Sequence, residues 1–149
     1  MHKMITEIRD ISLDDLDDIY LIETSSYNIP WTKSNLSDEI FKSNVLNLCI
    51  NANSSLIGYC FSYIVSNEMF ITNVCIHPDY RNKHLGTILL KNLLDKAKKI
   101  SIKCVFLEVR EKNFAAINLY KKLGFSQDCI RKNYYSNGDN ALLMHLYLI

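Results

Sequence analysis

The stretch "NVCIHPDYRNKHLGTILL" (Asn73–Leu90) decides the fold, because it joins a strand pattern directly to a helix pattern. Its first residues are apolar and rich in β-branched side chains, which favours a strand. The strand must end at His77-Pro78, since proline donates no backbone hydrogen bond and keeps its predecessor out of the helical region. From Gly86 onward apolar residues recur every three or four positions, which predicts an amphipathic helix. They are Leu89, Leu90, Leu93, Leu94 and Ala97.

Further strand and helix patterns lie on both sides of this unit. We expect strands within residues 5–11, 44–50, 56–66, 69–76, 104–109, 125–135 and 141–148. We expect the other helices after Ser12, Thr32 and Asn113, each a side chain suited to cap a helix, with Gly124 ending the last one. The last two strands form a hairpin, and Asn137-Gly138 suits a tight primed turn between them.

The order β-α-α-β-β-β-α-β-α-β-β predicts one α/β (α+β) fold. Its twisted sheet is mixed and mostly antiparallel, with a central β-α-β crossover and helices on both faces. A chain of 149 residues with 48% hydrophobic content has the size of a single domain, so residues 1–149 are assigned to one. We expect a monomer or a weak dimer.

Composition narrows the classes of partner. Seventeen Lys and Arg residues against 16 Asp and Glu give a formal net charge of +1, so we expect no direct nucleic-acid partner. The five cysteines and four histidines lack metal-ligand spacing, so no metal is expected. No apolar run is long enough for a membrane span or a signal peptide. The sequence therefore predicts a cytoplasmic protein with reduced cysteines and no membrane partner.

The segment Arg81–Gly86 is a candidate anion site. A helix amino terminus offers free amide groups and the positive end of the helix dipole, and both suit a phosphate group. Arg81 and Lys83 add positive charge, and Gly86 lets the backbone approach a ligand closely. On charge alone, however, a solvated polar turn explains the same residues.

Several stretches together resemble a known family. "NVCIHPDYRNKHLGTILL" (Asn73–Leu90), "FLEVREKNFAAINLYKKLGF" (Phe106–Phe125) and "RKNYY" (Arg131–Tyr135) are similar to the acetyl-CoA loop, catalytic strand, cofactor helix and closing strand of the GCN5-related N-acetyltransferases, the GNAT superfamily. Within it, "IPW" (Ile29–Trp31), "LEVR", "LYKKLGF" and "RKNYY" resemble the bacterial ribosomal-protein alanine N-acetyltransferases of the RimI type. The resemblance covers nearly the whole chain in the same order.

The resemblance implies acetyl-CoA as the co-substrate. The cofactor contacts that it implies are Val74, Cys75, Ile76, Arg81, Asn82, Lys83, His84, Leu85, Gly86, Thr87 and Asn113. The loop departs from the family pattern Arg/Gln-x-x-Gly-x-Gly/Ala, because His84 replaces the first glycine. If this position has a positive φ, His84 carries a strain of roughly 1 to 2 kcal/mol. We expect cofactor binding to be retained.

Glu108 is a carboxylate in an otherwise apolar strand. Period-two alternation places Val105, Leu107 and Val109 on one face and Phe106 with Glu108 on the other. From the residues alone, a strand glutamate paired with lysine or arginine is the simpler interpretation. The resemblance implies instead that Glu108 is the general base, acting through a water.

Acyl transfer to an amine also needs a proton for the departing thiolate. The resemblance implies that Tyr120 supplies it, although a core tyrosine is a common alternative. Asn113 caps its helix and, by the resemblance, also contacts the cofactor. A covalent route through Cys75 is disfavoured, because no activating base lies near it in the sequence and the family transfers directly.

The resemblance implies a protein α-amine as the acceptor, namely the amino-terminal alanine of a small-subunit ribosomal protein. Trp31, Tyr134 and Tyr135 are the expected acceptor contacts, although most surface aromatics only pack. Two alternatives stay open. In the first alternative, the acceptor is a small amine such as a polyamine, for which the acidic run 14–18 is the one candidate site. In the second alternative, the chain binds CoA without catalysis.

Overall fold

The computed structural model describes residues 3–148, in which the helices and strands follow the predicted order. The strands are β1 (Thr6–Asp10), β2 (Leu48–Ala52), β3 (Ser55–Val65), β4 (Glu68–Ile76), β5 (Cys104–Arg110), β6 (Ser126–Arg131) and β7 (Ala141–Tyr147). The α-helices are α1 (Leu16–Ser26), α2 (Lys33–Phe41), α3 (Leu85–Lys99) and α4 (Phe114–Lys122). Short 3-10 turns, η1 (Leu13–Asp15) and η2 (Pro78–Tyr80), precede α1 and follow β4.

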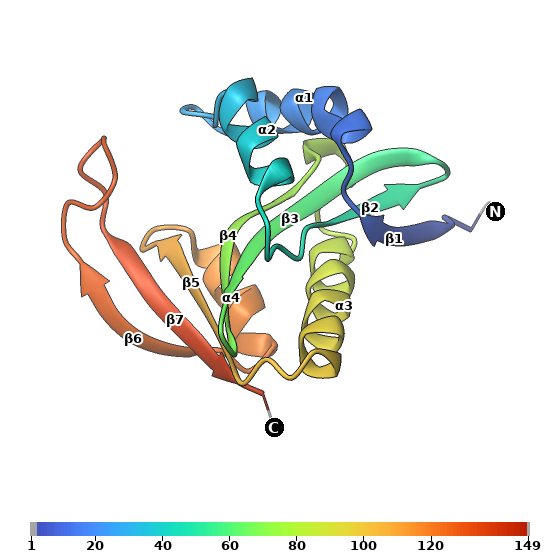
Figure 1. The fold of residues 1–149 in the computed structure, drawn as a ribbon. Coiled ribbons are helices and arrows are strands. Elements are labelled where there is room, and N and C mark those ends of the chain that lie inside the picture. The colour runs from blue at the N-terminus through green and yellow to red at the C-terminus, as the bar shows by residue number, and fades with distance from the viewer. Residues whose placement is uncertain (1–2, 149) are drawn as a thin grey trace.

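All seven strands belong to one sheet in the order β1-β2-β3-β4-β5-β7-β6 (Figure 1). Within residues 3–148 only β4 and β5 pair in parallel, and α3 makes the crossover between them. The predicted mixed, mostly antiparallel sheet with a central β-α-β unit is therefore confirmed.

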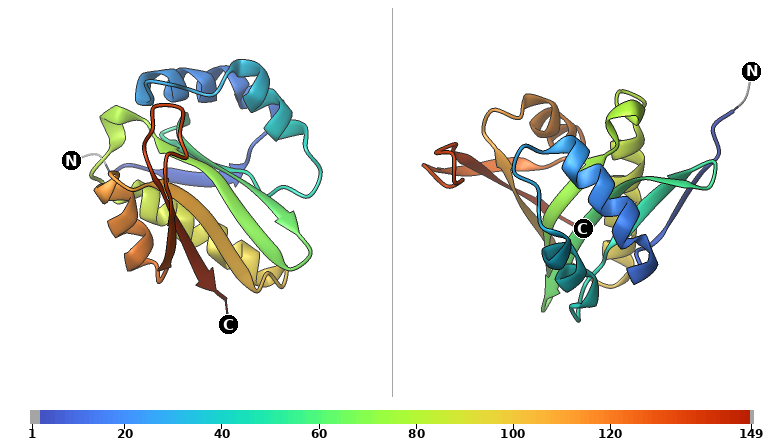
Figure 2. Two further views of the ribbon diagram at one scale, coloured as in Figure 1. Left: turned by 90° about the vertical axis from the view of Figure 1, so that its left-hand side faces the viewer. Right: turned by 90° about the horizontal axis from the view of Figure 1, so that it is seen from above.

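Helices cover both faces of the sheet, as expected (Figure 2). On one face, α3 and α4 bury the larger part of the core, which includes Leu89, Leu93 and Leu107. On the other face, α1 and α2 cover a smaller cluster, in which Ile19 and Leu36 pack against side chains of β3. Across the part of the chain that the structure describes, no helix has the length and apolar character needed to cross a membrane.

A β-bulge divides the sheet. Phe61 of β3 pairs with Asn73, but its neighbour Ser62 pairs with Ile71, so Thr72 is the extra residue of β4. The parallel pairing of β4 with β5 ends at Ile71 opposite Leu107. Beyond this point β4 pairs only with β3, while β5 pairs only with β7. The two strands therefore separate and leave a split between residues 72–76 and 108–110, visible in Figure 1.

Two of the three predicted caps, Thr32 and Asn113, hold helix ends, whereas Ser12 precedes the 3-10 turn η1 and its side chain forms no capping hydrogen bond. The Thr32 side chain accepts a hydrogen bond from the Asn35 amide at 3.0 Å, and Asn113 Oδ1 accepts one from the Ala116 amide at 3.2 Å. Gly124, directly after the end of α4, has a φ of 102°, as expected for a glycine that ends a helix. These local signals were confirmed because each depends on neighbours in the sequence.

The predicted tight turn at Asn137-Gly138 is wrong. β6 ends at Arg131, so the strand expected to run to Tyr135 is shorter and a long loop, residues 132–140, precedes β7. The Asn137 side chain accepts a hydrogen bond from the Asp139 amide at 3.1 Å, a local bond that competes with a two-residue hairpin turn. The two-residue turn with positive φ values lies instead between β2 and β3, at Asn53 and Ser54.

The strand expected over residues 44–50 also begins later, at Leu48. Asn44 has a φ of 57°, which strands do not adopt. The Asn47 side chain accepts a hydrogen bond from the Ser62 amide at 3.0 Å. A side chain thus replaces one of the backbone hydrogen bonds that would join two strands here. The chain therefore joins the sheet irregularly before β2.

Candidate functional site

The split in the sheet exposes backbone groups of β4. The His77 amide points toward β3 and donates to the Ile57 carbonyl at 2.7 Å. In an antiparallel pair, backbone groups point toward the partner strand at every second residue and away from it at the residues between. Val74 and Ile76 therefore direct their amides and carbonyls away from β3, into the split. Two side chains meet the carbonyls there: the Tyr27 hydroxyl donates to Val74 at 2.9 Å, and Arg81 Nε donates to Ile76 at 3.0 Å.

Cys75 differs from its two neighbours, because its side chain packs in the cluster beneath α1 and α2. Only 5% of the residue is exposed. This position agrees with the expectation that Cys75 contributes backbone rather than thiol chemistry.

The turn after β4 leads into the amino terminus of α3. His84, directly before the helix, has φ 61° and ψ 18°, so the condition for backbone strain at this position is met. Its side chain forms no capping hydrogen bond, so the amide groups of the first turn of α3 are not taken by the cap. Arg81 and Lys83 are exposed beside this turn.

Gly86 sets how closely α3 packs. A Cβ at this position would lie 3.4 Å from Leu119 Cδ2 of α4 and 3.8 Å from Ile76 Cγ1 of β4. The first turn of α3 therefore packs against both α4 and the end of β4, with room at this position for little more than a methyl group. One path thus runs from the free backbone groups of β4, past Arg81 and Lys83, to the free amides at the start of α3. This arrangement fits an elongated ligand with a phosphate at the helix end.

Glu108 lies on β5 at the edge of the split. The predicted alternation is confirmed: Leu107 and Val109 are 4% and 6% exposed, while Glu108 points to the opposite face and is exposed. Its carboxylate lies 3.5 Å from Arg131 Nη1, so the ion pair that the residues alone suggested is present. The carboxylate remains accessible to solvent, because 35% of the side chain is exposed.

Tyr120 lies on the face of the sheet opposite to that of Glu108. It lies on α4, packs edge-on against Phe125 at 5.7 Å between ring centroids, and is 8% exposed. Burial raises the pKa of its phenol above the ordinary 10.0, and the electrostatic influence of Cys60 and Tyr135 adds to the effect. Tyr120 in turn helps to raise the pKa of Tyr27, which lies beside Val74. The phenol therefore keeps its proton at neutral pH and lies close to the split.

We call residues 132–140 the tyrosine loop, since it carries Tyr134 and Tyr135. Their rings meet edge-to-face at 5.1 Å. A hydrogen bond with Glu108 is the main cause of a raised pKa at Tyr134, whereas burial is the main cause at Tyr135. The loop thus brings Tyr134 beside the pair of Glu108 and Arg131, since Arg131 lies 5.8 Å from the Tyr134 ring centroid.

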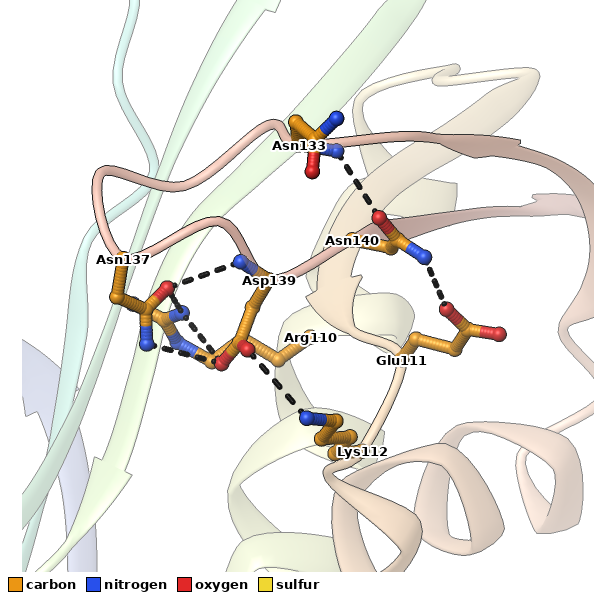
Figure 3. A network of polar contacts seen from close by, with 7 residues as sticks. All are labelled: Arg110, Glu111, Lys112, Asn133, Asn137, Asp139 and Asn140. Carbon is orange, nitrogen blue, oxygen red and sulfur yellow. Dashed lines mark hydrogen bonds and ion pairs between the residues drawn. The ribbon is translucent and has the colours of Figure 1, made fainter.

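The sequence analysis missed the network that holds this loop to the end of β5 (Figure 3). Arg110 Nη1 donates to Asn137 Oδ1 at 3.1 Å and to Asp139 Oδ2 at 3.2 Å. The only signal in the sequence is that Arg110 shares the face of Glu108, two positions earlier. Nothing local indicates that Asp139 is its partner.

Glu23 was also missed. It is 1% exposed, and its carboxylate accepts hydrogen bonds from the Tyr59 hydroxyl at 2.7 Å, Asn73 Nδ2 at 2.8 Å and the Trp31 amide at 2.9 Å. The available signal was its position on the apolar face of α1, four residues after Ile19. Glu23 joins α1, β3, β4 and the segment before α2.

The predicted acceptor contacts lie on two flanks of the site. Trp31 belongs to the α1–α2 side, where its ring packs 6.0 Å from that of Phe61. Tyr134 and Tyr135 lie on the tyrosine loop. Two of the four carboxylates in the acidic run are paired, because Arg9 forms two 2.8 Å bonds with Asp15 and Lys33 pairs with Asp17. Residues 3–148 contain no cluster of side chains suited to a metal ion.

Comparisons with known proteins agree with this geometry. The model of the acetyltransferase (GNAT) family matches residues 8–125. A Bacillus subtilis (strain 168) protein, provisionally named a ribosomal protein bS18-alanine N-acetyltransferase, is 40% identical over 139 residues, covering 92% of both chains. The ribosomal protein bS18-alanine N-acetyltransferase of Escherichia coli (strain K12) is 34% identical, covering 93% of this chain and 95% of the relative.

Solved structures give the same result. The crystal structure of the ribosomal-protein-S18-alanine N-acetyltransferase from Escherichia coli aligns with a TM-score of 0.91 at 32% identity, covering 96% of this chain and 94% of the other. The PaiA N-acetyltransferase from Thermoplasma acidophilum, solved in complex with coenzyme A, aligns with a TM-score of 0.82 at 25% identity, covering 97% and 100%.

Proposed function

Because the chain belongs to the acetyltransferase (GNAT) family and is an acyltransferase, we propose that it moves the acetyl group of acetyl-CoA to a protein α-amine. The acceptor is the amino-terminal alanine of a small-subunit ribosomal protein, as the names of the relatives suggest. The observation that carries the proposal is the split between β4 and β5, which has an accessible carboxylate, Glu108, on one face and a buried phenol, Tyr120, near it from the other.

The path from β4 to α3 holds the co-substrate in this proposal. The amides at the start of α3, with Arg81 and Lys83, bind the pyrophosphate, because a helix amino terminus and cations both favour anions. The amides of Val74 and Ile76 bind the pantetheine chain and the acetyl carbonyl, since unpaired backbone groups beside a bulge need partners. Acetyl-CoA supplies, when bound, a thioester whose acyl carbon the amine attacks.

Glu108 acts as the general base. Its exposed carboxylate accepts a proton from the acceptor ammonium through a water molecule. An α-amine has a pKa of about 7.7 to 8.0, so a sizeable minority is already neutral near pH 7.5, whereas lysine is almost fully protonated. A glutamate therefore suffices as the base for an α-amine.

Tyr120 acts as the general acid. Burial raises the pKa of its phenol, so the proton stays on the oxygen until the leaving sulfur develops negative charge. Trp31, Tyr134 and Tyr135 enclose the acceptor from its two flanks. The two flanks also give the peptide a direction, since its amine must lie between Glu108 and the split.

The test uses purified protein, acetyl-CoA and a peptide that begins with alanine and contains an internal lysine. Mass spectrometry should show acetylation of the α-amine alone, and a peptide with a blocked amino terminus should stay unmodified. Glu108→Gln and Tyr120→Phe should each lower turnover by roughly 10²- to 10⁴-fold without a change in the unfolding midpoint. Wild-type turnover in both variants would exclude the mechanism.

Two further arms separate the alternatives. Acetylation of spermidine in preference to the peptide would assign a small-amine acceptor. Tight acetyl-CoA binding by calorimetry, without turnover on either amine, would assign a non-catalytic CoA-binding protein. His84→Gly, compared with wild type in the same calorimetry, measures how much the left-handed histidine costs in cofactor affinity.

A further inference from the structure

The end of β5 holds the tyrosine loop through charged and polar contacts that take no part in the proposed chemistry. We propose that Arg110 and Asp139 are positioning residues, which fix the tyrosine loop in the place where it binds the acceptor peptide. This inference rests on the proposed function, because it assigns the loop to acceptor rather than cofactor binding.

Arg110 holds the loop in two ways. Its guanidinium donates to Asn137 and Asp139 at the far end of the loop, at 3.1 Å and 3.2 Å. The same group lies 3.9 Å from the ring centroid of Tyr135, which is close enough for a cation–π contact. One side chain therefore fixes both the backbone course of the loop and the position of one of its tyrosines. A lysine could supply the charge but not the flat guanidinium group that faces the Tyr135 ring.

Asp139 is the acceptor at the centre of the network. Its carboxylate accepts hydrogen bonds from Arg110 and, at 3.0 Å, from Asn137 Nδ2, and Lys112 lies 3.7 Å from its second oxygen. The hydrogen bond from Asn137 is the main cause of a lowered pKa, so Asp139 is fully ionised at neutral pH. The backbone closes the same turn, since the Tyr135 amide donates to the Asp139 carbonyl at 3.1 Å.

A second anchor lies beside the first. Asn140 Nδ2 donates to Glu111 Oε2 at 2.8 Å, and Asn140 Oδ1 accepts from the Asn133 amide at 2.9 Å. Asn140 thus joins the start of the loop to its end, and Glu111 joins both to β5 (Figure 3). Three consecutive residues, 110–112, hold the whole loop.

The anchor also fixes the distance between the loop and the proposed base. Arg110 follows Glu108 by two residues on the same face of β5, a rise of about 7 Å along a strand. The ring centroid of Tyr134 lies 5.8 Å from Arg131, which pairs with Glu108 at 3.5 Å. The ring centroid of Tyr135 lies 3.9 Å from Arg110. The strand that carries the base therefore sets where both tyrosines lie relative to it, which is the requirement for a loop that positions an acceptor.

The network is accessible to solvent, with 37% of the Arg110 side chain and 25% of the Asp139 side chain exposed. Exposed charge pairs contribute little to global stability. Loss of the anchor should therefore loosen the loop locally and leave the sheet intact, so that acceptor binding changes while cofactor binding does not.

The test compares Arg110→Lys and Asp139→Asn with wild type. Each variant should raise the KM for the peptide about tenfold, leave kcat and the KM for acetyl-CoA within about twofold, and leave the unfolding midpoint unchanged. Hydrogen exchange without substrates should show lost protection of the amides of Tyr135 and Gly138. Ser136→Ala, in the same loop, is the matched control and should behave as wild type. Combining the two substitutions should have a smaller effect than the sum of the separate effects, because both remove the bond between Arg110 and Asp139.

The outcomes separate this inference from the proposed function. Absent turnover of the wild-type protein on any peptide means that the proposed acceptor is wrong. Wild-type turnover with an unchanged peptide KM in both variants overturns the positioning role. Unchanged exchange of the loop amides overturns the anchor itself, whether or not the protein acetylates a peptide. An equal rise in both KM values, with a lower unfolding midpoint, shows a general structural role and also overturns the inference.

Discussion

The two flanks of the site are built by different physical means. On the α1–α2 flank, one buried carboxylate, Glu23, accepts three hydrogen bonds and holds Trp31 against β3 and β4. On the opposite flank, the tyrosine loop is held by solvent-accessible pairs around Arg110 and Asp139. Both flanks carry aromatic residues that we assign to the acceptor.

One site can therefore have a rigid flank and an adjustable flank. Removing a buried carboxylate leaves donors without partners in a medium of low dielectric constant, so the α1–α2 flank should tolerate little change. Exposed pairs exchange readily with water and salt, so the tyrosine loop should respond to conditions that leave the rest of the protein unaffected.

The largest effect should come from Glu23→Ala. Three donors, on Tyr59, Asn73 and Trp31, would lose their acceptor, and the free energy of unfolding should fall by about 3 kcal/mol. Urea unfolding followed by circular dichroism measures this, with the exposed Asp18→Ala on the same helix as the control. A loss no larger than that of the control would remove the distinction between the two flanks.

A smaller effect should follow from Tyr27→Phe, which removes the hydroxyl that donates to the Val74 carbonyl at 2.9 Å. The cost to stability should be about 1 kcal/mol, because one hydrogen bond is lost while water can replace part of it. The KM for acetyl-CoA should rise more than the peptide KM, since Val74 lies on the proposed cofactor path. The opposite pattern would move Tyr27 to the acceptor side.

Acid should release the tyrosine loop before the sheet unfolds. The pKa of Asp139 is lowered in the folded protein, so its contribution is complete above the ordinary carboxyl value of 3.8 and is lost as the pH falls through the lower folded value. Proton NMR of the Tyr135 ring should therefore change little from pH 7 to pH 5 and should shift below about pH 4. A shift centred above pH 5 would point to a different group.

Salt should produce the smallest effect. In 1 M NaCl the Debye length is about 3 Å, so the pairs around Asp139 are screened while the buried Glu23 contacts are not. Exchange of the loop amides should quicken a few-fold, and the Trp31 amide should keep its protection. Equal changes on both flanks would show that they do not differ in the way described.

Sequence patterns predicted the elements because each pattern is local. The order of strands and helices and the caps at Thr32 and Asn113 depend on neighbours within a few residues. The alternation in β5 placed Glu108 on the open face for the same reason. The roles of Glu108 and Tyr120 came from the resemblance and stay predictions.

The missing parts of the site depend on contacts between distant segments. Glu23 meets Tyr59 and Asn73, which lie 36 and 50 residues away, and Arg110 meets Asp139 across 29 residues. Residues 132–135 of the tyrosine loop were predicted to continue the strand, because the aromatic rings of Tyr134 and Tyr135 suit one. Its conformation is decided by Asn137, whose side chain bonds to Asp139 rather than leaving the turn to the backbone.

The burial of the cysteines has a practical consequence for watching this enzyme at work. Cys49, Cys60, Cys75 and Cys104 are buried, whereas Cys129 on β6 is exposed. A maleimide dye should therefore react first at Cys129, two residues before the strand ends and the tyrosine loop begins. The unmodified chain thus carries a natural attachment point for a fluorophore, with which the loosening of the loop expected in Arg110→Lys can be measured one molecule at a time.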